Sequence, residues 1–205
     1  MRRVLITCTQ PRANEIVHDL QSYSIDAHAM PTLLVEPCDI SVPNGEFDVM
    51  LITSVHAIND KLPALPIIAI GEETASIAQK NGCDVVQVGT GGVDDVDLSL
   101  YSNVLYPCAE EPTLIPENTT PWHIYKTVKN NQFDISHDVD VICIFSIKTA
   151  KIIKKHDLTD KIILCLSRNI EQVFHGVNVA DIASCTYPRY DAMKQLIDLY
   201  LRKHT

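Results

Sequence analysis

Hydroxyl and amide side chains recur directly after apolar segments that have the composition of buried strands. The set comprises Thr7, Thr9, Thr53, Ser54, Thr74, Ser146, Ser167 and Asn169. Each could simply cap the N-terminus of a helix, a contact that contributes about 1 kcal/mol to stability. Gathered at one edge of a sheet, the same positions would offer backbone N–H groups to carboxylates or phosphates. Taken singly, each residue leaves both interpretations open.

A tyrosine offers a second kind of chemistry. Tyr125 lies in the segment WHIYKT, directly after a proline-rich stretch. It could be a strand residue that packs against a connection between domains, or a phenol that points into a cleft. The sequence contains no nucleophile elbow, Walker loop, HExxH or GxGxxG pattern.

The distribution of histidine and cysteine argues against a metal centre. The eight histidines are scattered, and no two of them have ligand spacing beside a carboxylate. The seven cysteines are dispersed and contain no CxxC pair, so a disulfide framework or a zinc site is not expected. Cys143 and Cys165 lie inside apolar segments and are expected to be small core residues. We therefore predict no metal and no cofactor.

Composition narrows the class of protein further. The 205 residues carry a net charge of −9, which disfavours nucleic acid and anionic membranes as partners. No apolar run approaches the roughly 20 residues that span a bilayer. The basic N-terminus is followed by an apolar stretch too short for a signal peptide, so we expect a cytoplasmic protein.

The elements that must position these residues have the pattern of a parallel α/β protein. Residues 66–88 predict a buried strand, a turn at Gly71, a helix that ends at Gly82, and a second strand. Amphipathic helices are predicted near residues 11–23 and 190–203. Further strands are predicted at residues 4–7, 27–30, 49–53, 104–106, 141–145 and 162–166. Such strands alternate with helices that cover both faces of a sheet.

A faint internal repeat indicates two related domains. Residues 47–54 resemble residues 139–146, and each copy is an apolar strand that ends in serine. Residues 67–82 likewise resemble residues 162–176. The segments 31–43 and 107–127 are rich in proline and are predicted to be connections. Two copies of one βα set would give two similar domains of about a hundred residues.

The order of these pieces resembles the uroporphyrinogen-III synthase family along nearly the whole chain. The segments that carry the resemblance are LITSVHAI, IAIGEETASIAQKNG, VLYPCAEE, IYKT, IFSIKTA and CLSRNIEQVF. The clearest matches are the pair Thr53 and Ser54, the turn of Gly71 with Thr74, and Tyr125.

The resemblance implies a definite architecture. Two flavodoxin-like parallel-sheet domains would be joined by a two-stranded linker, with the active site in the cleft between the domains. The first domain would comprise residues 1–34 and 129–205, and the second residues 38–123. Residues 35–37 and 124–128 would form the linker strands. The repeat would then be a swapped one, because the chain completes the second domain before it finishes the first.

The resemblance also implies a reaction. Hydroxymethylbilane, a linear tetrapyrrole with eight carboxylates, would lose water and cyclise with inversion of ring D to give uroporphyrinogen III. The linear substrate closes by itself to the uninverted isomer, so the catalyst must mainly impose a conformation. The resemblance implies a monomer that needs no cofactor and could transiently contact hydroxymethylbilane synthase.

Roles for single residues follow from the same resemblance. Tyr125 takes the position of a cleft tyrosine that assists loss of the hydroxyl. Backbone N–H groups at Ser54, Ser146 and Ser167 would hold acetate and propionate groups. The predicted substrate-binding set is completed by Thr7, Gly71, Thr74 and Asn169.

The chain departs from the family pattern at three places. Cys8 and Cys108 stand where relatives often have arginine, and Leu166 with Ser167 replaces a second Gly turn. Arg12, Lys148 and Arg168 are candidates to replace the lost cations. A nucleophilic cysteine at position 8 or 108 is disfavoured, because no histidine is assigned beside either one.

Two other classes of function stay open at the level of sequence. A non-catalytic module of two α/β lobes could bind a small polycarboxylate or phosphate without accelerating any reaction. A nucleotide-dependent Rossmann enzyme is the weaker alternative, because Gly71 stands alone without a phosphate-binding glycine set.

Overall fold

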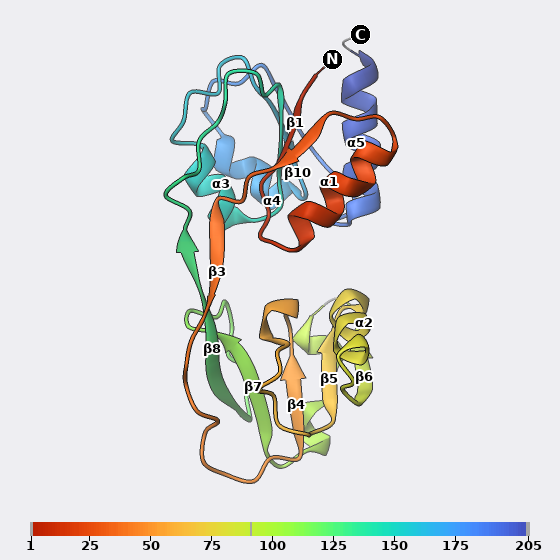
Figure 1. Cartoon of the computed structure of the whole chain (residues 1–205), viewed down its shortest axis with the longest axis vertical. Helices are drawn as coiled ribbons and strands as arrows, with labels where there is room; N and C mark the ends of the chain where they lie inside the picture. The colour runs from red at the N-terminus through yellow and green to blue at the C-terminus, as the bar shows by residue number, and fades with distance from the viewer. Residues whose placement is uncertain (1, 91, 204–205) are drawn as a thin grey trace. The chain divides into compact units, whose positions relative to one another are not determined.

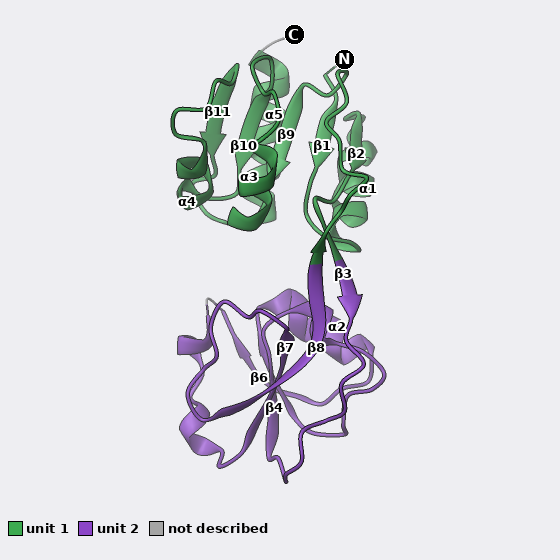
Figure 2. Ribbon diagram, turned by 90° about the vertical axis from the view of Figure 1, so that its left-hand side faces the viewer, with its two compact units in different colours: residues 1–34, 128–205 green, residues 35–127 purple. Residues whose placement is uncertain are grey.

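The computed structural model describes residues 2–90 and 92–203. The chain divides into two compact units, which Figure 2 shows in different colours. Unit 1 comprises residues 1–34 and 128–205, and unit 2 comprises residues 35–127. Among the described residues, no helix is long and apolar enough to cross a membrane.

The described part of unit 1 holds a five-stranded sheet in the order β11-β10-β9-β1-β2, with all neighbouring strands parallel. Its strands are β1 (Val4–Ile6), β2 (Ala27–Ala29), β9 (Val141–Ile144), β10 (Ile162–Cys165) and β11 (Asp181–Ser184). Its helices are α1 (Arg12–Ser22), α3 (Ile147–Ile153), α4 (Arg168–Glu171) with the 3-10 turn η4 (Gln172–Phe174), and α5 (Tyr190–Lys203).

Alternation along the strands divides the core of unit 1 into two layers. Val4 and Ile6 of β1 pack with the apolar faces of α1 and α5, which lie side by side in Figure 1. Leu5 points to the opposite face, where α3, α4 and η4 cover the sheet. Cys143 and Cys165 are fully buried, as predicted. The apolar runs of this sheet are therefore explained by helices on both faces.

The described part of unit 2 holds a six-stranded sheet in the order β3-β8-β7-β4-β5-β6. Its strands are β3 (Leu33–Pro37), β4 (Val49–Ile52), β5 (Ile67–Ile70), β6 (Val85–Gly89), β7 (Val104–Ala109) and β8 (Thr119–Lys129). The helical segments are α2 (Glu72–Lys80) and the 3-10 turns η1 (Val55–Ala57), η2 (Val93–Asp95) and η3 (Leu98–Leu100). The chain enters unit 2 within β3 and leaves it within β8.

The two sheets are versions of one arrangement with a permuted chain order. In unit 1, the neighbours β2-β1-β9-β10-β11 follow the flavodoxin-like order 2-1-3-4-5. In unit 2, β8-β7-β4-β5-β6 follow the same order when β7 and β8 are counted first. The β4–β5 pair thus corresponds to β9–β10, which are the segments of the predicted repeat. The parallel α/β fold and the swapped repeat are both confirmed.

Several elements differ from the sequence prediction. The predicted connections at residues 31–43 and 107–127 contain the strands β3 and most of β8, and β11 was not predicted. The prolines of residues 107–127 were interpreted as a sign of a connection, but Pro107 and Pro121 lie inside strands. Pro107 lies past the last residue of β7 that pairs with β4, and on the other side its register partner is Trp122 of β8. The helix predicted after Ser54 is a single 3-10 turn, η1.

Candidate functional site

The sheet of unit 2 reverses its strand order between β4 and β7. From β4 the chain continues to β5 on one side, and from β7 it continues to β8 on the other side. In parallel α/β sheets, ligands bind outside the carboxyl ends of the strands at such a switch point. Thr53 and Ser54 follow β4 directly at this position. These two residues therefore mark the position of the candidate site in unit 2.

Thr53 and Ser54 each meet a tyrosine. The hydroxyl oxygens of Thr53 and Tyr106 lie 3.2 Å apart, within hydrogen-bonding distance. The Ser54 side chain lies close enough to Tyr125 to act on the pKa of its phenol. Tyr106 packs in the core cluster under η2 and η3, and Tyr125 packs against the cluster that contains α2 and η1. Successive residues of an extended chain point to opposite faces of a sheet, which explains this division.

Tyr125 is half-buried in β8, and its phenol is kept in the protonated form. Burial raises the pKa of Tyr125, while the nearby Ser54 side chain acts in the opposite direction. The ring of His56 meets the Tyr125 ring edge-on, with 5.8 Å between ring centroids and 60° between ring planes. Burial also lowers the pKa of His56, which favours a neutral imidazole. The site therefore presents a neutral hydrogen-bond donor beside a neutral imidazole.

The N-terminus of α2 lies on the same face, since α2 packs against η1. Gly71 precedes this helix with φ of 90° and ψ of 140°, a backbone conformation that favours glycine. Thr74 is buried in the first turn of α2. Glu72 and Glu73 are also in this turn, and their negative charges offset the partial positive charge at the N-terminus of the helix. The helix start is consequently less favourable for an anion than the sequence pattern alone implied.

A cysteine and a histidine lie together on the neighbouring strands β7 and β8. Cys108 and His123 are register partners, with 3.7 Å between Sγ and Nδ1. This corrects the expectation that no histidine lies beside Cys108. Nδ1 also lies 2.8 Å from the carbonyl oxygen of Ala109. A carbonyl cannot donate, so Nδ1 must carry the hydrogen of that bond and cannot take the thiol proton. Burial raises the pKa of Cys108 to about 11, which disfavours an activated nucleophile.

In unit 1, Thr7 and Ser146 follow the two strands that flank its own switch point, β1 and β9. Thr7 is 1% exposed, and its hydroxyl donates to the carbonyl of Cys143 at 2.6 Å. Ser146 caps α3 by accepting a hydrogen bond from the backbone N–H of Thr149 at 3.1 Å. Ser167 precedes α4 without a side-chain capping bond, and Asn169 is exposed within that helix. Both hydroxyls at the switch therefore have structural partners.

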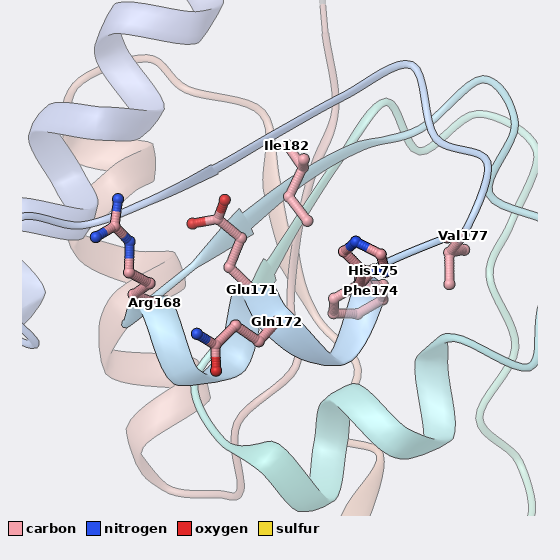
Figure 3. Close-up of a pocket in the computed structure, with 8 residues that line it drawn as sticks. Arg168, Glu171, Gln172, Phe174, His175, Val177 and Ile182 are labelled. Carbon is pink, nitrogen blue, oxygen red and sulfur yellow. The ribbon is translucent and has the colours of Figure 1, made fainter.

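A hollow of about 390 Å³ lies beside α4 and η4 in unit 1 (Figure 3). Arg168, Glu171 and His175 are among the residues that line it. Glu171 accepts a short hydrogen bond from the hydroxyl of Ser184. Arg168, one of the cations proposed from the sequence, thus borders a concave surface, whereas Ser167 and Asn169 are not among the lining residues.

The structure brings some predicted site residues together and adds one. Within unit 2, Ser54 and Tyr125 lie close together, and Gly71 and Thr74 lie at the start of the adjacent helix α2. Sequence reasoning missed His56, which contacts Tyr125 across nearly seventy residues of chain. Its position two residues after Ser54 was the available signal. Among the described side chains, no group of three or more His, Cys, Asp or Glu residues could hold a metal ion.

Comparison with known proteins gave matches at the level of structure. No protein-family model matches the sequence, and the curated proteins contain no significant match. A uroporphyrinogen-III synthetase from Helicobacter pylori is similar with a TM-score of 0.65 and 13% identity, covering 98% of this chain and 100% of that one. A mutant uroporphyrinogen III synthase from the extremely thermophilic bacterium Thermus thermophilus is similar with a TM-score of 0.56 and 13% identity, covering 99% and 100%. These similarities show that the chain has the fold of those structures over nearly its whole length.

Proposed function

We propose that this protein is a uroporphyrinogen-III synthase, a lyase that cyclises hydroxymethylbilane with inversion of ring D and loss of water. The observation that carries the proposal is Tyr125, a protonated phenol close to Ser54 and His56 beside a topological switch point. The similarity of fold to the two synthases supports it. The order of elements that suggested the family is a strand that ends in serine, followed by a strand that ends in a Gly turn. Unit 2 has both parts, whereas in unit 1 Ser167 takes the place of the glycine.

The chemistry of the proposed reaction suits this site. The hydroxyl of the terminal hydroxymethyl group leaves as water, and the carbon it leaves then bonds to ring D, so the departing oxygen needs a proton or a strong hydrogen bond as its bond to carbon breaks. A phenol is protonated at neutral pH, and burial raises the pKa of Tyr125 further, so its hydroxyl can donate to the departing oxygen. The remaining work is to hold the linear chain in the conformation that closes with inversion, which requires positioning and no strong base.

Eight carboxylates on the substrate require several anchoring points. We propose that backbone N–H groups at Ser54, Thr74, Ser146, Ser167 and Asn169 contribute to them. The N–H of Gly71 donates to the carbonyl of Gly89 at 2.7 Å, so Gly71 would contribute by shaping the turn before α2. Thr7 would contribute through its backbone, because its hydroxyl is already donated to Cys143. Arg168 is a cation that could join this set, while Arg12 stacks on the ring of Tyr190. The predicted cleft between two domains, the monomeric state and the cytoplasmic location remain predictions.

The decisive experiment supplies enzymatically made hydroxymethylbilane and separates the product isomers by chromatography. We expect the protein to give uroporphyrinogen III. A product that consists only of isomer I would refute the proposal. Binding of hydroxymethylbilane without acceleration would identify the non-catalytic binding module.

Replacing Tyr125 with phenylalanine tests the proposed acid. Tyr125→Phe removes the donor and keeps the ring, so the rate of isomer III formation should fall by about 100-fold or more. Tyr101→Phe in the same unit is the matched control, and circular dichroism reports whether the fold is retained. Unchanged turnover of Tyr125→Phe would remove this residue from the mechanism.

A further inference from the structure

Strand β8 contains one residue that has no partner in the parallel strand β7. Along most of the two strands, successive residues of β7 pair with successive residues of β8. The order changes at the end of β7, where Cys108 pairs with His123 and the next residue, Ala109, pairs with Tyr125. Ile124 is left over between two paired residues, which is the arrangement of a β-bulge.

The bulge is hydrogen-bonded on both sides, because β8 lies between β3 and β7 in the sheet. The carbonyl oxygen of Ile124 accepts the backbone N–H of Cys38, the residue after β3, at 2.8 Å. The carbonyl oxygen of Tyr125 accepts the backbone N–H of Glu110, the residue after β7, at 2.7 Å. Both neighbouring segments therefore hold the extra residue in a defined position.

Before the bulge, the side chains of β8 alternate between the two faces of the sheet. Trp122 packs in the core cluster that includes residues of η1 and α2, on what we call the η1 face. His123 lies on the opposite face, since its Nδ1 is 3.7 Å from Sγ of Cys108, a residue of the other core cluster. Ile124 returns to the η1 face. A regular strand would send the next side chain, Tyr125, back to the face of Cys108.

The bulge turns Tyr125 to the η1 face instead. Tyr125 packs against the same core cluster as Ile124, so two consecutive side chains lie on one face. Its ring meets the ring of His56, a residue of η1, edge-on with 5.8 Å between ring centroids. Bulges re-aim single side chains in this way and are over-represented next to active sites. The extra residue therefore accounts for the contact between Tyr125 and the turn after β4.

We propose that the bulge at Ile124 is the feature that positions the Tyr125 phenol in the candidate site. The use of this phenol as a donor to the departing oxygen rests on the proposed function above. The inference deepens that function, because it assigns the place of the phenol to the register between β7 and β8. Ile124 is then a positioning residue through its backbone, while its side chain fills the core.

Inserting one alanine between Cys108 and Ala109 tests the register directly. The inserted residue gives Ile124 a partner, so the two strands pair without a bulge and Tyr125 turns to the face of Cys108. We expect the rate of isomer III formation to fall by about 100-fold, as in Tyr125→Phe. The added length passes into the connection that follows β7.

The matched control is one alanine inserted between Leu114 and Ile115, which are exposed and lie outside the strands. It lengthens the same connection without changing the register, so the rate should stay within about twofold of the wild type. Circular dichroism and the fluorescence of Trp122, the single tryptophan of the sequence, report whether each variant keeps its sheet and its core.

An exchange of two residues distinguishes a turned tyrosine from a damaged sheet. In the variant with the insertion after Cys108, residue 124 still lies on the η1 face and residue 125 does not. Ile124→Tyr combined with Tyr125→Ile in that variant returns a phenol to the η1 face, and we expect it to raise the rate by about tenfold or more. A loss that this exchange does not reverse would be general damage to the sheet and would overturn the positioning role.

Nuclear magnetic resonance gives a readout that does not depend on turnover. The ring protons of His56 and Tyr125 should show a nuclear Overhauser effect in the wild type and in the loop control, and none in the variant with the insertion after Cys108. A signal that persists in that variant overturns the inference, even if the protein forms isomer III. A wild type that forms only isomer I refutes the proposed function, and the ring contact still decides whether the bulge places the phenol.

Discussion

At the scale of single residues, burial and partners separate side chains that look alike in the sequence. Ser54 and Ser146 both follow an apolar strand, but only Ser54 also reaches a tyrosine. Thr7 is buried and donates to a backbone carbonyl, so its hydroxyl supports the sheet. Cys108 lies beside His123, but the hydrogen bond from His123 to Ala109 leaves no base for the thiol.

Buried thiols make a prediction about alkaline stability. Burial raises the pKa of Cys165 to about 12 and raises the pKa of Cys143 well above the ordinary value of 9.0. The unfolded chain loses these protons above about pH 9 while the folded chain keeps them. The stabilisation is therefore complete below about pH 9 and is lost as the pH rises toward the folded pKa. The free energy of unfolding should fall by up to about 1.4 kcal/mol per pH unit for each thiol.

Urea unfolding at a series of pH values from about 8 to about 10 measures this slope. Cys165→Ala removes one of the two groups and should make the slope shallower, whatever it does to stability at neutral pH. A free energy of unfolding that stays constant across this range would contradict the assigned direction of both shifts.

At the scale of elements, the same strand–turn–helix unit occurs in both units, with a longer helix in unit 2 than in unit 1. In unit 2, β5 leads through Gly71 into the nine residues of α2. In unit 1, β10 leads through Ser167 into the four residues of α4 and then into η4. Gly71 has positive φ, whereas Ser167 has φ of −151° and ψ of 161°. The loss of glycine in unit 1 thus coincides with an extended backbone, which any residue can adopt.

The conformation of Gly71 gives a prediction for this element. A Cβ atom at Gly71 would meet open space, so Gly71→Ala creates no clash, but φ of 90° is unfavourable for alanine. We expect the free energy of unfolding to fall by about 1–3 kcal/mol. Gly92→Ala is the matched control, because Gly92 has an extended backbone and equally open space. Its effect should stay within about 0.5 kcal/mol. Equal effects of the two variants in urea unfolding would show that the positive φ is not required.

At the scale of the whole molecule, unit 2 is inserted into unit 1. The chain leaves unit 1 within β3 and returns within β8, and these two strands are neighbours in one sheet. The ends of unit 2 therefore lie on adjacent strands, as is typical of inserted domains. Each unit has core clusters of its own, formed by its own strands and helices.

Separate cores predict that unit 2 folds when it is expressed alone. A fragment of residues 35–127 should show the circular dichroism of a mixed α/β protein and a cooperative urea transition. A fragment of residues 35–118 lacks β8 and the buried Trp122 and Ile124, so it should not fold. An unfolded 35–127 fragment would show that unit 2 depends on the rest of the chain.

Local pattern was sufficient for much of the fold. The buried strands and the helices near both ends were predicted because their apolar periodicity is strong and lies within a dozen residues. Strand β11 was missed, and only the segments 35–37 and 124–128 of β3 and β8 were expected as strands, because prolines mask the rest of β8. Pro107 and Pro121 both lie in the paired stretch of β7 and β8, where their register partners are Trp122 and Tyr106, a pairing that the local sequence did not reveal.

The candidate site divides in the same way. The sequence by itself determined that hydroxyl residues end the strands and that a tyrosine follows the proline-rich stretch. Both features can be recognised within a few neighbouring residues, from residue type and from the spacing of apolar side chains. Only the tertiary structure decided which of these residues meet. The pairing of β8 beside β7 brings Tyr125 to the turn after β4, where Ser54 lies close to it and the ring of His56 contacts it. Contacts between distant segments depend on strand order and register, and a one-residue change in register would turn Tyr125 to the opposite face of the sheet.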